Sequence, residues 1–301
     1  MKPVLVVMAA GIGSRYGGLK QLDPLGPSGE LLLDYAVYDA VRAGIERVVF
    51  VIRRDMEGEA RATLGRRYSG RVEVAYAFQE LEDVPAAYHP RNRAKPWGTG
   101  HAVLAARRAV AGPFLVANAD DLYGPEGIAQ LVTFLEDPAQ PSHHHALVAF
   151  RLGDTLSRHG PVSRGVCLLD GAGGLRGIEE CTGVERNAAG ICGLAGDGTR
   201  RSFAGGEPVS MNLWGFRPSI FPLLTERFEH FLARHADEAE AEFYLPHAIT
   251  ELVAAGSARV HVFTTSFPWL GVTARADREV VTAQLRELVA RGVYPSPLWA
   301  P

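Results

Sequence analysis

The chain has 301 residues, of which 47% are hydrophobic and 22% are charged. These are the proportions of a packed globular protein, and they exclude extensive disorder. The formal net charge is −3 at pH 7, so the charge balance does not indicate nucleic acid or an anionic membrane as a partner. No apolar run approaches the roughly 18 residues that a membrane helix requires.

The N-terminus lacks the features of a secretory signal. A single basic residue, Lys2, precedes the short apolar run 4–10, which gives way at once to glycines. The three cysteines form no C-x-x-C pair, and their odd number and wide spacing favour reduced thiols over disulfides or zinc. We therefore expect a cytoplasmic protein with no membrane partner.

The first half of the chain alternates between strand and helix patterns. Expected strands cover 2–10, 47–52, 72–78, 114–118 and 146–151, and expected helices cover 31–43, 56–66, 98–110 and 127–135. The alternation predicts a mostly parallel sheet with helices on both faces.

The second half has a different pattern, in which strands separated by glycine-rich turns come before the helices. Expected strands cover 166–170, 175–179, 208–216 and 259–264, and expected helices cover 221–236, 244–255 and 275–290. No linker is evident, so we predict a single α/β domain, residues 1–301. Its three layers would be Rossmann-like, around a mixed, mostly parallel sheet, with a smaller β-rich lid from the second half.

A glycine-rich loop, AAGIGSRYGGLKQL, directly follows the first expected strand at residues 9–22. Glycines let the backbone approach a ligand closely and point several N–H groups at one anion. Arg15 offers a planar fork to phosphate oxygens, and Lys20 offers a compact charge. The loop therefore predicts a site for a polyphosphate.

Three other interpretations of this loop fit less well. A Rossmann fingerprint requires glycine where Tyr16 stands, and a Walker A loop requires G-K-[ST] around Lys20. A plain strand–helix turn does not explain two basic residues among four glycines.

The loop resembles the signature G-x-G-[ST]-R, followed by a lysine, of the nucleotidyltransferase or NDP-sugar pyrophosphorylase superfamily. The resemblance continues through four further motifs and covers nearly the whole chain. It implies a GT-A-like fold in which residues 1–151 bind an NTP, residues 152–270 bind the acceptor, and residues 271–301 form a C-terminal helix and tail. It also implies catalytic roles for Arg15 and Lys20, which would stabilise the departing pyrophosphate. The nucleotide-binding residues implied for this loop are Ala10, Gly11, Gly13 and Ser14.

A second motif, KPWGTGHAVLAA at residues 95–106, places a Gly-Thr-Gly turn before a helix, whose first N–H groups have no partner within the helix. It resembles the family segment G-T-G/A-H-A, which implies that Gly98 and Thr99 face the nucleobase or its ribose. By the same resemblance Gln79 reads the edge of the base. His101 is expected to pack or orient locally rather than to catalyse, and residues 81–94 depart from the family pattern as an insertion.

The segment VANADDLYG, residues 116–124, is an expected buried strand that ends in Asp120 and Asp121. Open α/β sheets bind ligands at the carboxyl ends of their strands, and Mg²⁺ favours one or two carboxylates together with phosphate oxygens. The resemblance implies that Asp120 is the magnesium ligand, with Asp121 as second choice. An Asp-rich turn that caps the following helix is the alternative. Thr273 stands where the family often has a second metal ligand, which leaves that ligand unassigned.

The acceptor site is implied by four short motifs in the second half. By resemblance Gly165 lies against the sugar phosphate, and three polar residues bind sugar hydroxyls: Glu180, Asn212 and Glu242. The tract His143-His144-His145 is expected to be a solvated loop, because adjacent residues rarely point at one ion.

These features together predict Mg²⁺-dependent transfer of a nucleotidyl group from an NTP to a sugar 1-phosphate, which gives an NDP-sugar and pyrophosphate. Two alternatives stay open. One is a cytidylyltransferase for a polyol or choline phosphate, which the adjacent Lys20 and Gln21 favour by resemblance. The other is a non-catalytic sensor of nucleotide sugars. The base, the acceptor and whether the chain forms a homo-oligomer are left open.

Overall fold

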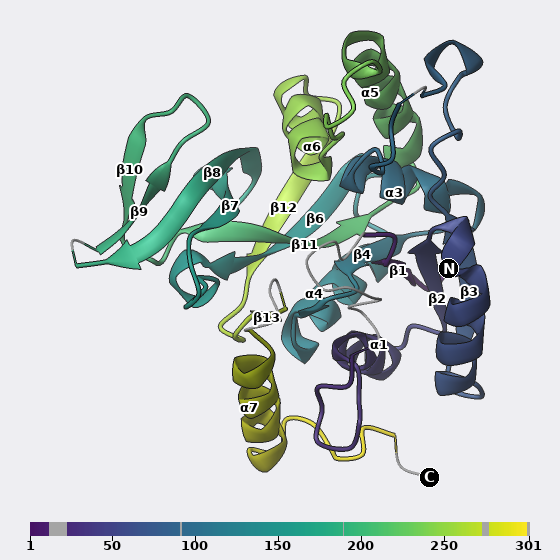
Figure 1. Cartoon of the computed structure of the whole chain (residues 1–301), viewed down its shortest axis with the longest axis vertical. Helices are drawn as coiled ribbons and strands as arrows, with labels where there is room; N and C mark the ends of the chain where they lie inside the picture. Colours follow the sequence, from purple (N-terminus) through teal and green to yellow (C-terminus); the bar gives the residue numbers. More distant parts are fainter. Residues whose placement is uncertain (12–22, 91, 189, 273–276, 300–301) are drawn as a thin grey trace.

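The computed structural model describes residues 1–11, 23–90, 92–188, 190–272 and 277–299 (Figure 1). Within these ranges eleven strands form one mixed sheet, in the order β10-β9-β8-β7-β11-β4-β1-β2-β3, with β6 paired to β11 and β12 paired to β6. Its strands are β1 (Val4–Met8), β2 (Arg47–Ile52), β3 (Glu73–Phe78), β4 (Phe114–Asn118), β6 (His144–Arg151), β7 (Val162–Leu169), β8 (Leu175–Asn187), β9 (Gly190–Leu194), β10 (Arg200–Phe203), β11 (Pro208–Phe216) and β12 (Arg259–Thr264). A separate small ribbon pairs β5 (Asp121–Leu122) with β13 (Leu270–Gly271).

The first strands of the sheet are parallel because helices connect them. β1 pairs in parallel with β2 and β4, and β2 pairs in parallel with β3. Leu5, Val6 and Val7 of β1 are at most 1% exposed, as expected for a strand that is buried on both faces.

Helices cover both faces of this sheet (Figure 1). α1 and α4 pack on one face and α3, α5 and α6 on the other, and each face has its own apolar core. The helices are α1 (Leu32–Arg42), α2 (Glu57–Ala60), α3 (Thr99–Ala105), α4 (Pro125–Glu136), α5 (Ile220–His235), α6 (Leu245–Ala254) and α7 (Asp277–Ala290). The predicted three-layer α/β fold is confirmed. None of the helices in the described ranges has the length and apolar character of a membrane span.

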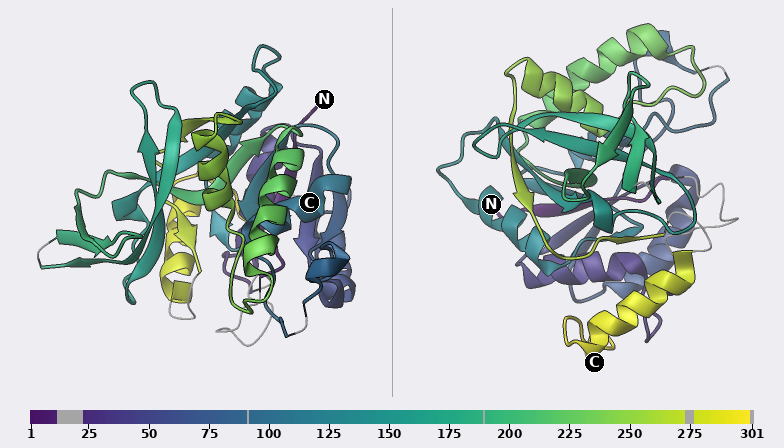
Figure 2. Two further views of the ribbon diagram at one scale, coloured as in Figure 1. Left: turned by 90° about the horizontal axis from the view of Figure 1, so that it is seen from above. Right: turned by 90° about the vertical axis from the view of Figure 1, so that its left-hand side faces the viewer.

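The second half extends the sheet further than the sequence pattern indicated. β8 continues to Asn187 rather than ending near residue 179, and β9 and β10 lie where the sequence pattern predicted no strand. These strands project from one end of the sheet (Figure 2), where many of their side chains are exposed on both faces. An exposed ribbon does not need the apolar alternation by which strands are recognised.

Two local predictions were wrong. The expected helix 56–66 is broken into a 3₁₀ turn, the short α2 and a π turn, in a segment that contains the weak helix formers Gly58 and Gly65. The expected histidine loop is instead the start of β6. His145 is fully buried, its Nδ1 accepts the Arg217 N–H at 3.2 Å, and burial lowers its pKa to about 3. The three cysteines are free thiols, as predicted.

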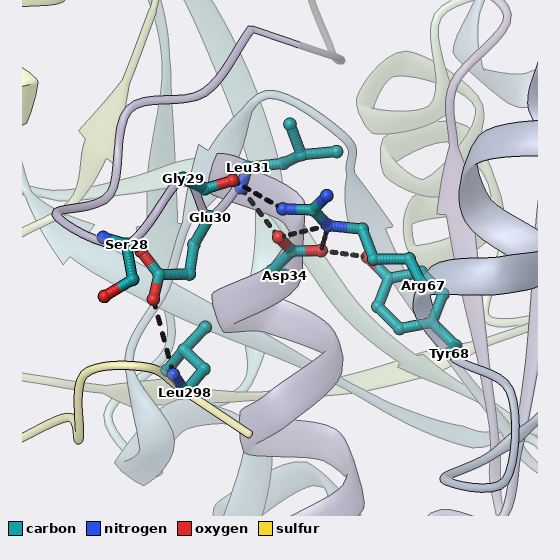
Figure 3. A network of polar contacts seen from close by, with 8 residues as sticks. All are labelled: Ser28, Gly29, Glu30, Leu31, Asp34, Arg67, Tyr68 and Leu298. Atoms are coloured by element: carbon teal, nitrogen blue, oxygen red, sulfur yellow. Dashed lines mark hydrogen bonds and ion pairs between the residues drawn. The ribbon is translucent and has the colours of Figure 1, made fainter. Parts of the chain in front are cut away.

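Polar contacts join the start of α1 to residues 67–68 and to the C-terminal tail (Figure 3). Asp34 accepts hydrogen bonds from Arg67 Nε at 2.7 Å and from the Tyr68 hydroxyl at 2.6 Å. Glu30 accepts the backbone N–H of Leu298 at 3.3 Å. α7 and the tail share an apolar cluster with α1 and β5, so they form part of the same folded body.

A buried carboxyl on α1 predicts that stability depends on pH. Asp39 is 1% exposed and accepts the Tyr294 hydroxyl at 2.7 Å. Burial raises its pKa from 3.8 to about 7, so the folded state keeps a proton that the unfolded chain loses. The free energy of unfolding should therefore fall as the pH rises from about 4 to about 7, by about 1.4 kcal/mol for each unit of raised pKa.

Urea unfolding at several pH values tests this expectation, with Asp39→Asn as the variant. Asn keeps the acceptor for Tyr294 but cannot ionise, so the slope of stability against pH should become shallower. Some slope should remain, because burial also raises the pKa of Asp34. Identical slopes for the variant and the wild type would contradict the assignment to Asp39.

Candidate functional site

A cavity of about 780 Å³ lies at the carboxyl ends of β1, β3 and β4. This is the edge at which open parallel sheets bind ligands, because the connecting loops diverge there. The lining residues are Met8, Ala10, Gly11, Gln79, Asn92, Ala94, Lys95, Pro96, Gly98, Thr99, Ala102, Asn118, Asp120, Asn212, Ala239, Glu240 and Glu242. A smaller cavity of about 230 Å³ lies between residues 153–159 and α7, and none of the predicted site residues lines it.

The residues predicted to hold the nucleobase form one side of the large cavity. Gln79 follows β3, and its Nε2 donates to the Gly98 carbonyl at 2.9 Å. Thr99 begins α3, and its Oγ1 accepts the Leu245 N–H at 2.9 Å. Gly98 has a φ of +104°, and a Cβ there would lie 2.7 Å from the carbonyl oxygen of Phe243. This side of the cavity is therefore fixed against the segment that leads into α6.

His101 packs locally, as predicted. It is 1% exposed and stacks on Phe228, with the ring centroids 4.8 Å apart. Burial lowers its pKa to about 4, so the ring is neutral near pH 7. Its Nδ1 lies 3.5 Å from Gln79 Nε2, so the ring also helps to place that amide.

The two neighbouring aspartates differ in their surroundings. Asp120 lines the cavity. Asp121 is 5% exposed and accepts hydrogen bonds from Asn118 Nδ2 at 2.7 Å and from the Tyr123 hydroxyl at 3.1 Å. Burial, and after it the Asp120 charge, raise the pKa of Asp121. Asp120 and not Asp121 lines the cavity, and the role of Asp120 as the magnesium ligand stays a prediction.

The donors around Asp120 suit a hard cation. Asp120 and Asn118 offer oxygen atoms at the end of β4, and Mg²⁺ prefers such ligands. Among the described residues, no group of three or more His, Cys, Asp or Glu side chains could hold a metal by itself. A magnesium ion at Asp120 would therefore rely largely on phosphate oxygens of the substrate, which is the usual arrangement for this ion.

Asn212 lies where the sheet divides. β11 pairs with β7 at Ser210 and with β4 from Trp214, and between them the register with β6 shifts. Asn212 sits in this irregularity with a φ of +62°, a left-handed conformation that asparagine tolerates better than most residues. The bend brings Asn212 to the cavity.

The four residues predicted for the acceptor are only partly brought together. Asn212 and Glu242 line the cavity, whereas Gly165 and Glu180 do not belong to its lining. Gly165 pairs with Glu180 across β7 and β8, next to Ser210 of β11. Burial raises the pKa of Glu180. The roles of all four residues stay predictions.

Several predicted residues lie outside the described ranges. Gly13, Ser14, Arg15 and Lys20 belong to residues 12–22, and Thr273 belongs to residues 273–276. Two residues that border these segments are described. Gly11, before the first segment, lines the cavity, and Asp277, after the second, begins α7.

Some lining residues had no predicted role. Lys95 forms an ion pair with Glu242 at 2.7 Å and a longer one with Glu240 at 3.4 Å. Asn118 ends β4 and Asn92 lies in the insertion before the Gly-Thr-Gly turn. The signal for Asn118 was its place at a strand end beside two aspartates. The insertion offered no pattern from which Asn92 could be recognised.

Comparison with known proteins defines the class to which this fold and site belong. Residues 4–164, more than half of the chain, match the family model described as nucleotidyl transferase. The chain therefore belongs to the nucleotidyltransferase family, and the predicted transferase activity class is confirmed.

One solved structure with a similar fold is that of the inositol-1-phosphate CTP transferase from T. maritima. The two chains are 16% identical, with a TM-score of 0.59, and the match covers 95% of this chain and 97% of the other. No curated protein matches the chain.

Proposed function

We propose that this nucleotidyltransferase transfers a nucleotidyl group from an NTP to a sugar 1-phosphate, in a reaction that depends on Mg²⁺. The observation that carries the proposal is the composition of the large cavity. Gln79, Gly98 and Thr99 line it on the base side, and Asp120 and the predicted acceptor groups Asn212 and Glu242 line the same cavity. One cavity thus offers groups suited to both substrates, together with a carboxylate.

The reaction requires no strong base from the protein. An oxygen of the acceptor phosphate, already ionised near pH 7, attacks the α-phosphorus of the NTP. The bond from that phosphorus to the bridging oxygen breaks, and pyrophosphate leaves. Bound Mg²⁺ would neutralise charge on the phosphate oxygens. Positioning and charge stabilisation then supply the catalysis, and by family resemblance Arg15 and Lys20 contribute to them.

The groups on the acceptor side suit a polyhydroxylated molecule. Carboxylates such as Glu242 accept hydrogen bonds from hydroxyl groups, and the amide of Asn212 can both donate and accept. Lys95 holds Glu242 in place, which limits the orientations in which this carboxylate can accept. An acceptor with several hydroxyl groups at fixed spacing would use both residues.

A polyol phosphate is the second candidate acceptor, with CTP as the donor. The similar fold of a protein described as an inositol-1-phosphate CTP transferase favours it. The sequence pair Lys20-Gln21 favours it too, through its resemblance to cytidylyltransferases of sugar-alcohol phosphates. Hydroxyl-binding groups on the acceptor side would serve either kind of molecule.

Pyrophosphate release in the presence of Mg²⁺ tests the proposal. Each of the four NTPs is combined with a panel of sugar 1-phosphates, inositol 1-phosphate, other polyol phosphates and choline phosphate. We expect one NTP to release pyrophosphate only when a sugar 1-phosphate is present. Release with a polyol or choline phosphate alone would support the second candidate.

The same panel can overturn both candidates. Tight binding of an NDP-sugar without turnover of any pair would point to the non-catalytic sensor that the sequence left open. Mg²⁺ omitted, or replaced by Ca²⁺, is the control for metal dependence, and full activity without added Mg²⁺ in the presence of EDTA would contradict that part of the proposal.

A further inference from the structure

Two segments that lie far apart in the sequence form one side of the large cavity. Residues 92–97 lead into the base side of the cavity, and residues 238–243 lead into the acceptor side. We call these two segments together the double wall. Nearly one hundred and fifty residues separate them along the chain, so their contact has to be made by specific interactions.

Arg93 joins the two segments. Its guanidinium donates to the carbonyl oxygens of Lys95 at 2.7 Å and Pro96 at 3.0 Å in its own segment. It also donates to the carbonyl oxygens of Glu238 at 3.0 Å and Ala241 at 2.5 Å in the other. These four hydrogen bonds all go to main-chain oxygens, so Arg93 fixes the two backbones relative to each other.

The chemistry of this position requires arginine. The side chain is 9% exposed, and its guanidinium lies 4.0 Å from the ring centroid of Trp97. Only arginine offers five N–H donors in a rigid planar fork that can reach acceptors on several sides at once, and it stays charged when buried. A lysine would place one compact charge there and would leave some of the carbonyl oxygens without a donor.

The cavity side of the double wall carries groups for both substrates. Phe243 N–H donates to the Trp97 carbonyl at 2.7 Å, directly before Gly98 on the base side. Across the two segments, the Lys95 ammonium and the Glu242 carboxylate of the acceptor side lie 2.7 Å apart. A shift of one segment against the other would therefore move groups of both sites together.

We propose that Arg93 is a positioning residue that holds the double wall in its substrate-binding arrangement before either substrate binds. The inference rests on the proposed function, because it assigns the two sides of the wall to an NTP and to a phosphorylated acceptor. Arg93 itself does not line the cavity among the residues described for it, so it acts through the segments that it joins.

The proposal has a consequence that loss of stability alone would not produce. When the wall is already ordered, neither substrate has to order it on binding. Without Arg93 the first substrate must order both segments, and the second then binds to a wall that is already in place. Because the first substrate orders the wall, the second substrate binds more tightly, and the two substrates show positive cooperativity.

The test compares Arg93→Met and Arg93→Lys with a control, Arg217→Met. Arg217 is also partly buried and also donates to main-chain oxygens of another segment, with Asp137 O at 3.0 Å, but it does not line this cavity. KM for the NTP is measured at low and at saturating acceptor, with the substrate pair that releases pyrophosphate for the wild type. Hydrogen exchange of the Phe243 and Gly100 amides is followed in the absence of substrates.

For Arg93→Met we expect KM for the NTP to rise about tenfold at low acceptor and clearly less at saturating acceptor. Arg93→Lys should show the same pattern to a smaller degree, and it is the variant to use if Arg93→Met does not fold. The Phe243 amide donates to Trp97 and the Gly100 amide donates to Phe243, so both hydrogen bonds join distant parts of the chain. Both amides should exchange faster in both variants. Arg217→Met should change neither KM nor these amides.

Two outcomes would overturn the inference. One is an increase in KM that is equal at low and at saturating acceptor, and the other is the same behaviour in Arg217→Met. Failure of the proposed function is seen separately, as a wild type that turns over no substrate pair. In that case the exchange data still decide the role of Arg93, because unchanged exchange of both amides in its variants would overturn the inference without any turnover.

Discussion

Replacement of Asp120 by Asn is expected to lower kcat for pyrophosphate release by at least about two orders of magnitude. Asp120 is the carboxylate that lines the cavity just after the end of β4. Asn keeps the size of the side chain but removes its negative charge, which is the part that would bind a divalent cation. Activity should also require more Mg²⁺ for half-maximal turnover, because the remaining ligands would come mainly from the substrate.

The matched control for this prediction is Asp170→Asn. Asp170 also follows a strand, β7, but it accepts the N–H groups of Ala172 and Gly174 in its own turn and lies outside the cavity lining. Its replacement should leave kcat and the Mg²⁺ dependence unchanged. Thermal unfolding of both variants shows whether either has lost its fold. Turnover of Asp120→Asn within about threefold of the wild type, with an unchanged Mg²⁺ requirement, would sink the assignment of the metal to Asp120.

The parallel half of the fold could be predicted from sequence because its strands are buried on both faces. The runs 47–52 and 114–118 were predicted with the exact bounds of β2 and β4. Such runs are short and mostly apolar, and the segments between them have apolar residues at helical spacing. The strand pattern and the helix pattern therefore support the same alternation of strands and helices. The resemblance to family motifs implied that Gln79, Gly98 and Asp120 belong to one site, and the structure brings them to one cavity.

The acceptor half was less predictable because its geometry depends on pairing between distant residues. Asn212 reaches the cavity through a shift of register in β11. The role of Arg93 depends on carbonyl oxygens almost 150 residues away along the chain. Every residue has a main-chain oxygen, so the amino-acid sequence does not show which of them Arg93 contacts. Gly165 and Glu180 follow family motifs in the right order, yet the order of motifs does not state which side chains line one cavity.

The histidine tract shows a related limit. Adjacent histidines in a segment flanked by proline suggest a solvated loop, and His143 is in fact exposed. His145 is instead buried beside Phe216, with ring centroids 5.5 Å apart, because β6 lies between β11 and β12. Tertiary packing thus overrode a local preference, which composition alone could not reveal.

Replacement of Gly98 by Ala is expected to cost at least about 3 kcal/mol of stability, because strain and overlap add at this position. Gly98 has a φ of +104° with an extended ψ, a region that is essentially restricted to glycine. A Cβ would lie 2.7 Å from the oxygen and 2.9 Å from the nitrogen of Phe243. Both atoms belong to the main chain, so no side-chain rotation can relieve the contact.

The same substitution should weaken the binding of the NTP beyond its effect on stability. Phe243 is hydrogen bonded to Trp97 and Gly100 on either side of Gly98, so the overlap must push the base side away from the segment before α6. The Gly98 carbonyl would then leave Gln79 Nε2, to which it is now bonded at 2.9 Å. We expect KM for the NTP to rise more than KM for the acceptor, because the displaced groups are those of the base side.

Gly256→Ala separates overlap from backbone strain. Gly256 also has a positive φ, +69°, but a Cβ there would have no heavy atom within 4 Å. Its replacement should therefore cost only the conformational penalty, about 1–2 kcal/mol, with both KM values unchanged. Urea unfolding with a constant m-value measures the two costs on one scale. An equal loss of stability in the two variants would show that the close approach of Phe243 to Gly98 does not hold the base side of the cavity in place.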